Sequence, residues 1–375
     1  MAALIAQRYK VLSHFLLKFA VTKNEIMKIA VLVSGGVDSS VALQLLKNEG
    51  HDVTAFYLKI WLQDEFSFLG NCPWEEDLEF VRKVCEQTNV PLEVISLQNE
   101  YWDKVVSYTI SEIKEGRTPN PDMFCNRLIK FGDFYDKIDI SFEKVASGHY
   151  GQIAYENEKY YLKRSPDPIK DQTYFLAYLT QQQLARALFP IGKYTKKEIR
   201  KIAADYDLAN QMRKDSQGIC FLGQIKFSDF IKYHLGELPG EIIEIETGKI
   251  LGKHPGYYYF TIGQRSGIGL SGGPWFVVEK NIKENKILIS KDVALIEKEK
   301  NHFSVTNFNW INEPPEKENL QVKIRHGEHF FNCSLKFQND NLAEVTMDRP
   351  DRGIAAGQFA VFYDGDYCLG GGVIC

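Results

Sequence analysis

Long hydrophobic runs are missing from this sequence. Nowhere do about 18 consecutive uncharged apolar residues occur, so we expect no transmembrane helix. Closely spaced cysteines are missing too, because the seven cysteines include neither a Cys-x-x-Cys pair nor a Cys/His cluster at zinc spacing. This pattern argues against a structural zinc site and favours a reduced, intracellular environment, and we assign no metal-ligating residue.

The sequence also lacks a strong charge of either sign. A net charge of −4 disfavours indiscriminate nucleic-acid binding, but it is compatible with a basic patch on one face, so RNA binding stays an open question. With 375 residues, of which 44% are hydrophobic, the chain is long enough for two or three domains with sizeable cores. We therefore expect a soluble globular protein.

The first part of the chain has a composition of its own. Residues 1–24 contain four basic residues and no acidic residue, which is compatible with an amphipathic targeting leader. Alternatively, residues 1–27 are a dispensable extension or follow a misassigned start, because Met27 stands directly before the first convincing strand. We expect a cytoplasmic protein, with an organelle matrix as the alternative if the leader is a transit peptide.

Strand and helix patterns alternate from residue 28 onward. A continuous apolar run over 28–33 is typical of a buried strand, and a helix is predicted from residue 39 to a stop at Gly50. The alternation continues with a strand over 52–61, a helix over 75–89, a strand over 92–97, a strand ending in a loop over 144–150, and a helix over 195–206 that opens with a Thr195/Glu198 capping box. This order predicts an α/β fold with a parallel sheet, where ligands usually bind at the strand ends.

After about residue 223 the pattern changes. Aromatic and β-branched runs alternate with Gly, Asn and Asp turns, which predicts an antiparallel β region. An Asp-Gly pair predicts a two-residue hairpin turn between residues 363 and 367, and residues 312–319 are typical of a solvated linker between strands. The runs expected to form this region are GYYYFTIG (256–263), PWFVVEK (274–280), KILIS (286–290), LQVKIRHG (320–327), FFNCSLKF (330–337), LAEVTM (342–347) and FAVFYDGDYCLGG (359–371).

The most specific chemical signal is VLVSGGVDSS, residues 31–40. Gly35 and Gly36 allow a tight turn after the buried strand, and the amides at the start of the next helix then face outward with the positive end of the helix dipole. No Gly-Lys-Ser/Thr follows, so this is not a Walker A loop. Ser-Gly-Gly-x-Asp-Ser after a strand is instead the pyrophosphate loop of enzymes that cleave ATP between the α and β phosphates. A simple helix-capping turn is the alternative.

From about residue 28 onward the sequence resembles the family of tRNA-specific 2-thiouridylases (MnmA/TrmU). The motifs that carry the resemblance are SGGVDSS (34–40), FYLKIW (56–61), GRTPNPDMFCN (116–126), SGHY (147–150), KDQTYFL (170–176), KDSQGICFLG (214–223), TIGQR (261–265) and AGQFAVFY (356–363). The fold this implies, after the leader, is a pyrophosphate-loop ATPase domain of adenine nucleotide α-hydrolase-like type over 28–222, a small central domain over 223–285 and a C-terminal antiparallel β-barrel over 286–375.

The resemblance also implies a reaction. The C2 oxygen of the wobble uridine, position 34 of tRNA, would be exchanged for sulfur while ATP is cleaved to AMP and pyrophosphate. Mg²⁺ is expected to accompany ATP, and the partners are expected to be the tRNA anticodon loop and a persulfide donor such as a cysteine desulfurase relay. The pyrophosphate loop is consistent with this reaction, because adenylation would turn a poorly reactive, urea-like oxygen into a leaving group and the loop would hold the departing pyrophosphate.

Two cysteines are expected to carry the sulfur chemistry. Cys125 falls three residues after Asp122, a good capping residue, so we expect its sulfur in a first helical turn whose dipole favours the thiolate. Cys220 stands between Gly218 and Gly223, as expected of a loop that accepts and delivers sulfur. The resemblance assigns Cys125 as the nucleophile and Cys220 as the persulfide carrier, which would leave a disulfide between them. The alternative, a small buried hydrophobic role, is accepted only for the other cysteines in helices and strands, Cys85, Cys333 and Cys368.

The remaining site residues follow from the phosphate loop and the resemblance. Those expected at the nucleotide are Leu32, Val33, Ser34, Gly35, Gly36, Val37, Asp38, Ser39, Leu58 and Gly148. Those expected beside the target base or on the tRNA are Asn120, Pro121, Asp122, His149, Lys170, Asp171, Gln172, His326, Gly327 and Gln358. As ordinary alternatives, Lys170 and Asp171 form a solvated surface pair and His149 is a loop histidine with its hydrogen bonds satisfied. His326 and Gly327 depart from the Arg-Tyr-Arg run of many relatives, and Ser266 stands where a basic residue is common, which puts those tRNA contacts in doubt.

Other classes of protein are less consistent with these motifs. A different ATP-pyrophosphatase, such as an amidating ligase, would share the loop but would need no cysteine pair. A non-catalytic RNA-binding protein would be expected to have lost Asp38 or Cys125, and both are present. An iron–sulfur variant is disfavoured, since no second cysteine follows Cys125 three residues on.

Overall fold

A computed structural model describes the chain except for residues 1–25, 61–72, 216–226, 293, 298–300 and 352. Across the described residues, no helix combines the length and the apolar character needed to cross a membrane. The leader expected over 1–27 and the loop that carries Cys220 lie largely or wholly outside the described residues.

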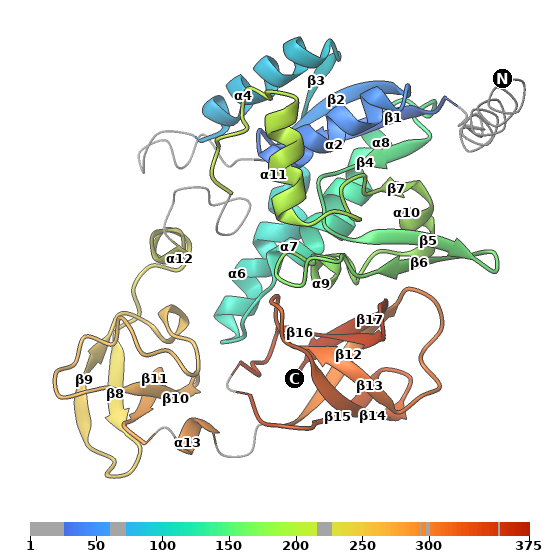
Figure 1. Cartoon of the computed structure of the whole chain (residues 1–375). Coiled ribbons are helices and arrows are strands. Elements are labelled where there is room, and N and C mark those ends of the chain that lie inside the picture. Colours follow the sequence, from blue (N-terminus) through green and yellow to red (C-terminus); the bar gives the residue numbers. More distant parts are fainter. Residues whose placement is uncertain (1–25, 61–72, 216–226, 293, 298–300, 352) are drawn as a thin grey trace, which may run out of the picture.

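A parallel sheet organises the first part of the chain, in the order β3-β2-β1-β4-β7 (Figure 1). Its strands are β1 Lys28–Val33, β2 Asp52–Lys59, β3 Leu92–Ser96, β4 Lys144–Ala146 and β7 Ala187–Leu188. All four pairings are parallel, and β1 lies at the centre between β2 and β4. The predicted α/β fold is therefore confirmed.

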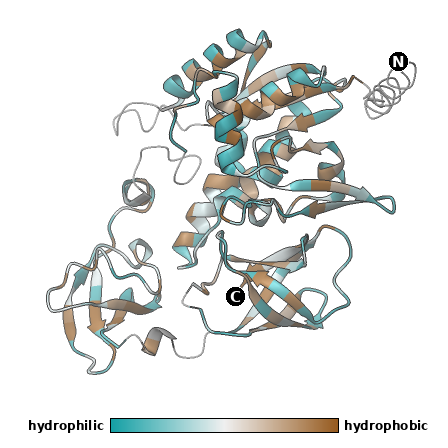
Figure 2. Ribbon diagram, in the orientation of Figure 1, coloured by the Kyte–Doolittle hydropathy of each residue, from teal (hydrophilic) through white to brown (hydrophobic). Residues whose placement is uncertain are grey.

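Side-chain alternation along β1 assigns its two faces to two cores. Ile29 and Val31 pack into a core with residues of α2 and α4, whereas Ala30 and Leu32 face a second core that contains Cys125. Teal and brown turns alternate along α4 in Figure 2, as expected of a helix with one buried stripe. The helices that cover the first face are α2 Val37–Asn48 and α4 Pro73–Thr88, with α11 Lys196–Asp205 packed against α2. Those near the second face are α5 Gln98–Tyr101, η2 Trp102–Val106, α6 Ser107–Lys114, α7 Pro121–Phe124, η3 Cys125–Asp133, α8 Phe134–Lys137, α9 Thr173–Leu176 and α10 Gln181–Arg186.

Helix ends follow the sequence signals. Gly50 takes a φ of +84° directly after α2, which explains why the helix stops there. The side chains of Thr195 and Glu198 form the predicted capping box at the start of α11, so that signal is confirmed.

A four-stranded sheet with order β10-β11-β8-β9 forms the central domain. Its elements are β8 Gly240–Glu244, β9 Ile250–His254, η4 Tyr257–Tyr259, β10 Phe276–Asn281 and β11 Lys286–Ser290, with α12 Phe227–Leu235 before it and α13 Ala294–Glu297 after it. Two expectations are wrong here. The pairing of β8 with β11 is parallel, and residues 257–259 form a 3₁₀ turn instead of a strand, because the three tyrosines pack side by side and direct their hydroxyls to other segments. Strand β11 belongs to this sheet, although it lies beyond the expected domain end at residue 285.

The C-terminal strands form a closed antiparallel barrel. Strands β12, β15, β14, β13, β16 and β17 follow one another, and β12 also pairs with β17, which closes the ring. They span β12 His302–Trp310, β13 Asn319–Lys323, β14 Phe331–Asn339, β15 Leu342–Met347, β16 Phe359–Asp364 and β17 Tyr367–Ile374. The predicted β-barrel and the hairpin between 363 and 367 are confirmed, although the two turn residues are Gly365 and Asp366, since Asp364 pairs with Tyr367.

A hairpin from the first domain extends the barrel sheet. Strands β5 Gln152–Glu156 and β6 Lys159–Lys163 were not predicted as part of any sheet. They join the barrel because Cys368 of β17 pairs with Leu162 of β6. One eight-stranded sheet therefore runs across both domains, while the central domain lies apart from it (Figure 1).

Candidate functional site

The glycine loop connects β1 to α2 as the sequence predicts. Gly35 has a φ of +75°, and Gly36 is the extended residue before α2 and has no side chain to cap the helix. The first amides of α2 are therefore available for an anion, together with the positive end of the helix dipole. Ser39 stabilises the turn, because its Oγ accepts a hydrogen bond from the Ser34 amide at 3.2 Å and donates one to the Gly36 carbonyl at 3.1 Å.

Residues from the neighbouring strands flank this loop. Leu58 lies near the end of β2 and Gly148 follows β4, so the sheet order places one on each side of β1. A Cβ atom on Gly148 would lie 2.6 Å from the Ser39 nitrogen, so only glycine allows this close approach to the start of α2. The structure thus brings the predicted nucleotide-binding residues of β1, β2 and β4 to one edge of the sheet.

A cluster of charged side chains adjoins Asp38. The Lys196 ammonium lies 2.8 and 2.9 Å from the two Asp38 oxygens, and the Tyr150 hydroxyl donates to Asp38 Oδ1 at 2.8 Å. Lys196 also lies 2.8 Å from Asp215, whose other oxygen pairs with Lys170 at 2.7 Å. Partial burial alone would raise the pKa of Asp215, but the hydrogen bonds from Lys170 and Lys196 hold it well below its usual range.

The sequence analysis missed several residues around the loop. The Asn210 amide donates to the Gly35 carbonyl at 2.8 Å, and a Cβ on Gly35 would lie 2.7 Å from the Arg213 guanidinium. Arg213 pairs with Asp77 of α4. The KDSQGICFLG motif (214–223) contains Asp215 and closely follows Asn210 and Arg213, and the capping Thr195 directly precedes Lys196. The motif and the capping box therefore indicated the right segments, but neither identified these side chains.

The helix that carries Cys125 differs from the expectation in its cap and in its burial. Asn120, not Asp122, is the capping residue, and its side chain accepts a hydrogen bond from the Met123 amide at 3.4 Å. Cys125 consequently lies beyond the first turn, at the start of the π-helical segment η3. The expected exposure to the helix dipole is therefore wrong for this conformation.

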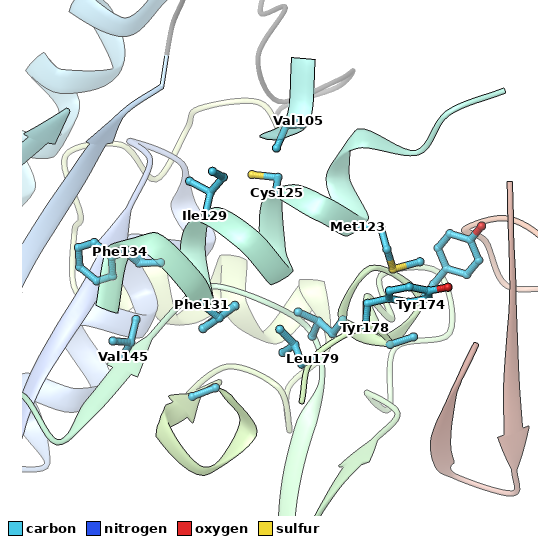
Figure 3. Close-up of a cluster of buried hydrophobic side chains, with 14 of the residues drawn as sticks. Val105, Met123, Cys125, Ile129, Phe131, Phe134, Val145, Tyr174, Tyr178 and Leu179 are labelled. Atoms are coloured by element: carbon cyan, nitrogen blue, oxygen red, sulfur yellow. The ribbon is translucent and has the colours of Figure 1, made fainter. Parts of the chain in front are cut away.

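Cys125 is fully buried in a hydrophobic cluster. Its side chain points toward Val105 of η2, beside Ile129 (Figure 3). Burial raises the pKa of the Cys125 thiol, and the nearby Lys130 opposes this rise without cancelling it. The expected lowering of the pKa is thus wrong here, because desolvation outweighs nearby positive charge. In this conformation Cys125 is a neutral thiol. Cys85, Cys333 and Cys368 are buried as predicted.

The residues just before Cys125 line the same helix start. Pro121 is buried at the first helical position. Asp122 has one buried carboxylate oxygen without a hydrogen-bond partner among the described residues. A buried carboxylate oxygen normally requires a donor, so this atom is suited to receive one from a bound molecule.

Two residues predicted to contact tRNA, Asp171 and Lys170, form ion pairs within the protein. Asp171 is fully buried, accepts a hydrogen bond from Thr173 Oγ1 at 2.9 Å and pairs at 3.0 Å with Lys323, which is equally buried. The alternative expectation, a solvated pair of Lys170 and Asp171, is therefore wrong, whereas contact of Asp171 with tRNA stays a prediction. Lys170 is directed toward Asp215 and remains about one-third exposed.

Other predicted contacts lie close to these groups. Gln172 is half-buried and accepts a hydrogen bond from the Tyr150 amide at 3.0 Å. His149 Nδ1 lies 2.7 Å from Ser147 Oγ, and its ring packs between Phe131 and Phe189. Burial lowers the pKa of His149 well below its usual value, so this imidazole is neutral.

The predicted contacts from the barrel are spread over two segments. His326 stacks on Phe175 of α9 with ring centroids 4.8 Å apart, and Gly327 has open space around it. Gln358 precedes Phe359, whose ring lies 5.8 Å from that of Phe124 near Cys125. The structure thus brings the barrel against the Cys125 helix, while Cys220 lies outside the described residues.

Comparisons with known proteins cover most of the chain. Family models match residues 27–224 (tRNA methyl transferase HUP domain), 228–291 (tRNA methyl transferase PRC-barrel domain) and 300–374 (aminomethyltransferase beta-barrel domain). A tRNA-specific 2-thiouridylase MnmA of Parabacteroides distasonis is 47% identical over 356 residues, 93% of this chain and 99% of that protein. The MnmA protein of Porphyromonas gingivalis is 44% identical over 359 residues, with the same coverage of both chains. A solved U34-tRNA thiolase, NcsA from Methanococcus maripaludis, is similar over 58% of this chain and 70% of that chain, at 17% identity and a TM-score of 0.33, too low to support an inference.

Proposed function

Because this chain belongs to the family of tRNA-specific 2-thiouridylases of the MnmA type, we propose that it uses ATP to replace the C2 oxygen of the wobble uridine of tRNA with sulfur. The observation that carries the proposal is the 47% identity to a named thiouridylase along 93% of the chain. The geometry of the glycine loop supports it, since the exposed start of α2 and the close approach of Gly148 suit the phosphates of a nucleotide.

ATP would supply an adenylyl group that activates the uridine oxygen as a leaving group. The amides at the start of α2 would hold the pyrophosphate, and Gly148 would let the backbone after β4 approach the nucleotide. Asp122, next to Cys125 in the helix start, would accept a hydrogen bond from the target base through its unpaired oxygen. The pair Leu58 and Gly148 would border the nucleotide from the two neighbouring strands.

Sulfur transfer would use both cysteines. The terminal sulfur of a persulfide on Cys220 would reach C2 as AMP leaves. In one route it would attack C2 directly, and Cys125 would then attack the inner sulfur, which frees the thiolated base. In the other route Cys125 would attack the inner sulfur first and release the terminal sulfur as sulfide, which then attacks C2. In both routes the Cys125 and Cys220 sulfurs end joined as a disulfide, and an external thiol must reduce it before the next cycle. Because Cys125 is buried, its helix must move before the sulfurs can approach. The donor would be a persulfide-carrying protein.

Mg²⁺ would be bound mainly by the phosphates of ATP. Among the described residues, no group of three or more His, Cys, Asp or Glu side chains is arranged to hold a metal ion. Mg²⁺ commonly binds through substrate phosphates and one or two carboxylates, so this composition fits an ion that arrives with the nucleotide. The unpaired bases of the anticodon loop would be recognised without opening a duplex. We propose residues 28–222 for catalysis and the two β domains, expected over 223–285 and 286–375, for tRNA, although the sheet of the central domain extends to Ser290 of β11.

Mass spectrometry of tRNA nucleosides tests the proposal. A strain without the gene should lose 2-thiouridine and keep its other tRNA modifications. The purified protein with ATP, tRNA and a persulfide donor should form AMP, pyrophosphate and 2-thiouridine, and Asp38→Ala should form none of them while it remains folded. Unchanged 2-thiouridine in the deletion strain would refute the proposal.

A further inference from the structure

We infer that Lys196 is a ligand of the nucleotide's β and γ phosphates, and that it pairs with Asp38 only while the phosphate loop has no nucleotide. The inference rests on the proposed function, because it assumes that the loop binds ATP. Lys196 belongs to none of the motifs that carry the family resemblance, so its position in the structure is the basis of the argument.

The first argument is position. Asp38 is the second residue of α2, so its carboxylate lies beside the amides that would hold a phosphate. The Lys196 ammonium contacts both oxygens of this carboxylate, at 2.8 and 2.9 Å. A phosphate bound at the start of α2 would therefore lie next to this ammonium, and a multiply charged phosphate would compete with a single carboxylate for it.

The second argument is that Lys196 is held in place at its backbone. The Lys196 amide donates to Asp167 Oδ2 at 2.9 Å, and the Lys170 amide donates to Asp167 Oδ1 at 3.0 Å. One carboxylate thus fixes the chain at both lysines. The Lys196 side chain, 15% exposed, is free to change its partner while its backbone stays in place.

The third argument is that both carboxylates beside Lys196 have other partners. Three cations, Lys170, Lys196 and Arg200, contact Asp215. Lys196 also pairs with Asp38. If Lys196 turned to a phosphate, Asp215 would keep Lys170 and Arg200, and Asp38 would keep the Tyr150 hydroxyl. The exchange would leave neither carboxylate without a partner, so it would cost little.

Nucleotide affinity tests this inference. Lys196→Met should weaken the binding of ATP and of pyrophosphate by about 10- to 100-fold, as expected for loss of one charge-assisted hydrogen bond, and should change AMP affinity less than about twofold. Lys197→Met is the matched control, because Lys197 is the exposed next residue of the same helix, and it should bind ATP like the wild type. Isothermal titration calorimetry measures each affinity, and thermal unfolding shows whether each variant is folded. If Lys196→Met does not fold, Lys196→Gln takes its place.

A thermodynamic cycle with Asp38→Asn separates a direct contact from simple neutralisation of Asp38. If Lys196 contacts phosphate, Lys196→Met should weaken ATP binding by a similar factor in the Asp38→Asn background. If Lys196 only neutralises Asp38, it should have no effect in that background, and the inference is then wrong. ATP affinity of Lys196→Met within twofold of the wild type, or an equal loss for AMP, would also overturn it. Failure of the wild type to bind ATP would instead refute the proposed function.

Discussion

The ion pair between Asp171 and Lys323 shows how a single residue connects two domains. Asp171 precedes α9 of the catalytic domain, whereas Lys323 ends β13 of the barrel, and both side chains are completely buried. Lys323 also lies over the Phe330 ring, 4.3 Å from its centre. Burial lowers the pKa of Lys323 and the Asp171 charge opposes this. Two opposite charges that are buried as a pair compensate for each other's loss of hydration, but either charge buried alone destabilises the folded protein.

Lys323→Met should therefore lower the free energy of unfolding by about 3–5 kcal/mol, because it leaves Asp171 charged and unpaired in the core. Lys317→Met is the control, since Lys317 pairs with Asp364 on the surface and its loss should cost less than about 1 kcal/mol. Urea unfolding, monitored by fluorescence, measures the free energy of unfolding of both variants. Adding Asp171→Asn to Lys323→Met should recover part of the loss, and equal costs for the two lysines would contradict the argument.

Substitution of Cys125 and Cys220 gives a second prediction about single residues. Cys125→Ser and Cys220→Ser should each abolish thiolation from a persulfide donor, while Cys375→Ser, at an exposed position, should leave it nearly unchanged. Peptide mapping after a single turnover without reductant should find residues 125 and 220 cross-linked. Thiolation by Cys125→Ser without any cross-link in the wild type would show that Cys125 is only a core residue.

Among the elements, the two π-helical segments beside Cys125 are the least regular. η2 Trp102–Val106 and η3 Cys125–Asp133 adjoin each other through Val105 and Cys125, and Phe131 inside η3 departs from helical dihedral angles. π-helical turns are rare and often occur at functional sites, where a small change of register turns a side chain to another face. These segments are thus the best candidates for the movement that exposes Cys125.

Alkylation of the thiols measures this movement. In the resting protein, iodoacetamide should modify Cys125 much more slowly than the exposed Cys375, because Cys125 is buried and its raised pKa keeps it a thiol. ATP together with tRNA should increase the rate at Cys125 and leave Cys85, in the core of another face, unchanged. Mass spectrometry of the labelled peptides reports each site. Equal rates at Cys125 with and without the substrates would contradict the proposed opening.

The same elements show what a sequence can and cannot predict. The glycine loop, the strand before it and the helix after it follow from local patterns, because a tight turn and an apolar run have few alternatives. The helix at Cys125 was predicted, but its cap was not, because Asn120 and Asp122 are both good capping residues and the structure uses Asn120. Its π-helical register was not predicted either, since no local pattern indicates it. Asp171 was misplaced for a similar reason, because its partner Lys323 lies 152 positions away and no local pattern indicates it.

For the whole molecule, the segment before Cys125 is where the three domains meet. Lys280 of the central domain donates to the Gly116 carbonyl at 2.5 Å, and a Cβ on Gly116 would collide with Ile282. Two residues later, the Thr118 amide donates to Ala356 of the barrel domain at 2.8 Å. Both β domains therefore contact the segment that leads directly into the Cys125 helix.

The buried contact of Lys280 predicts a pH dependence of stability. Burial lowers the pKa of Lys280 from 10.5 to about 8. Between these values the unfolded chain holds a proton that the folded protein has lost, so stability should increase with pH. Relative to Lys280→Met, the wild type should gain up to about 3 kcal/mol between pH 8 and pH 10.5. Urea unfolding at several pH values tests this, with the exposed Lys283→Met as control. A constant difference between wild type and Lys280→Met would contradict it.

Closure of the barrel through β17 also affects how the chain can fold as it is synthesised. Strand β17, residues 367–374, pairs with β12 to complete the ring and with β6 to join it to the first domain. The core around Cys125 likewise includes Phe359 and Cys368. Because the ribosome delivers residues in order, the parallel sheet can form early, but its second core stays open until the last strands emerge. A ribosome that stalls before residue 367 would therefore hold a nascent chain with an exposed hydrophobic face, a natural target for chaperones.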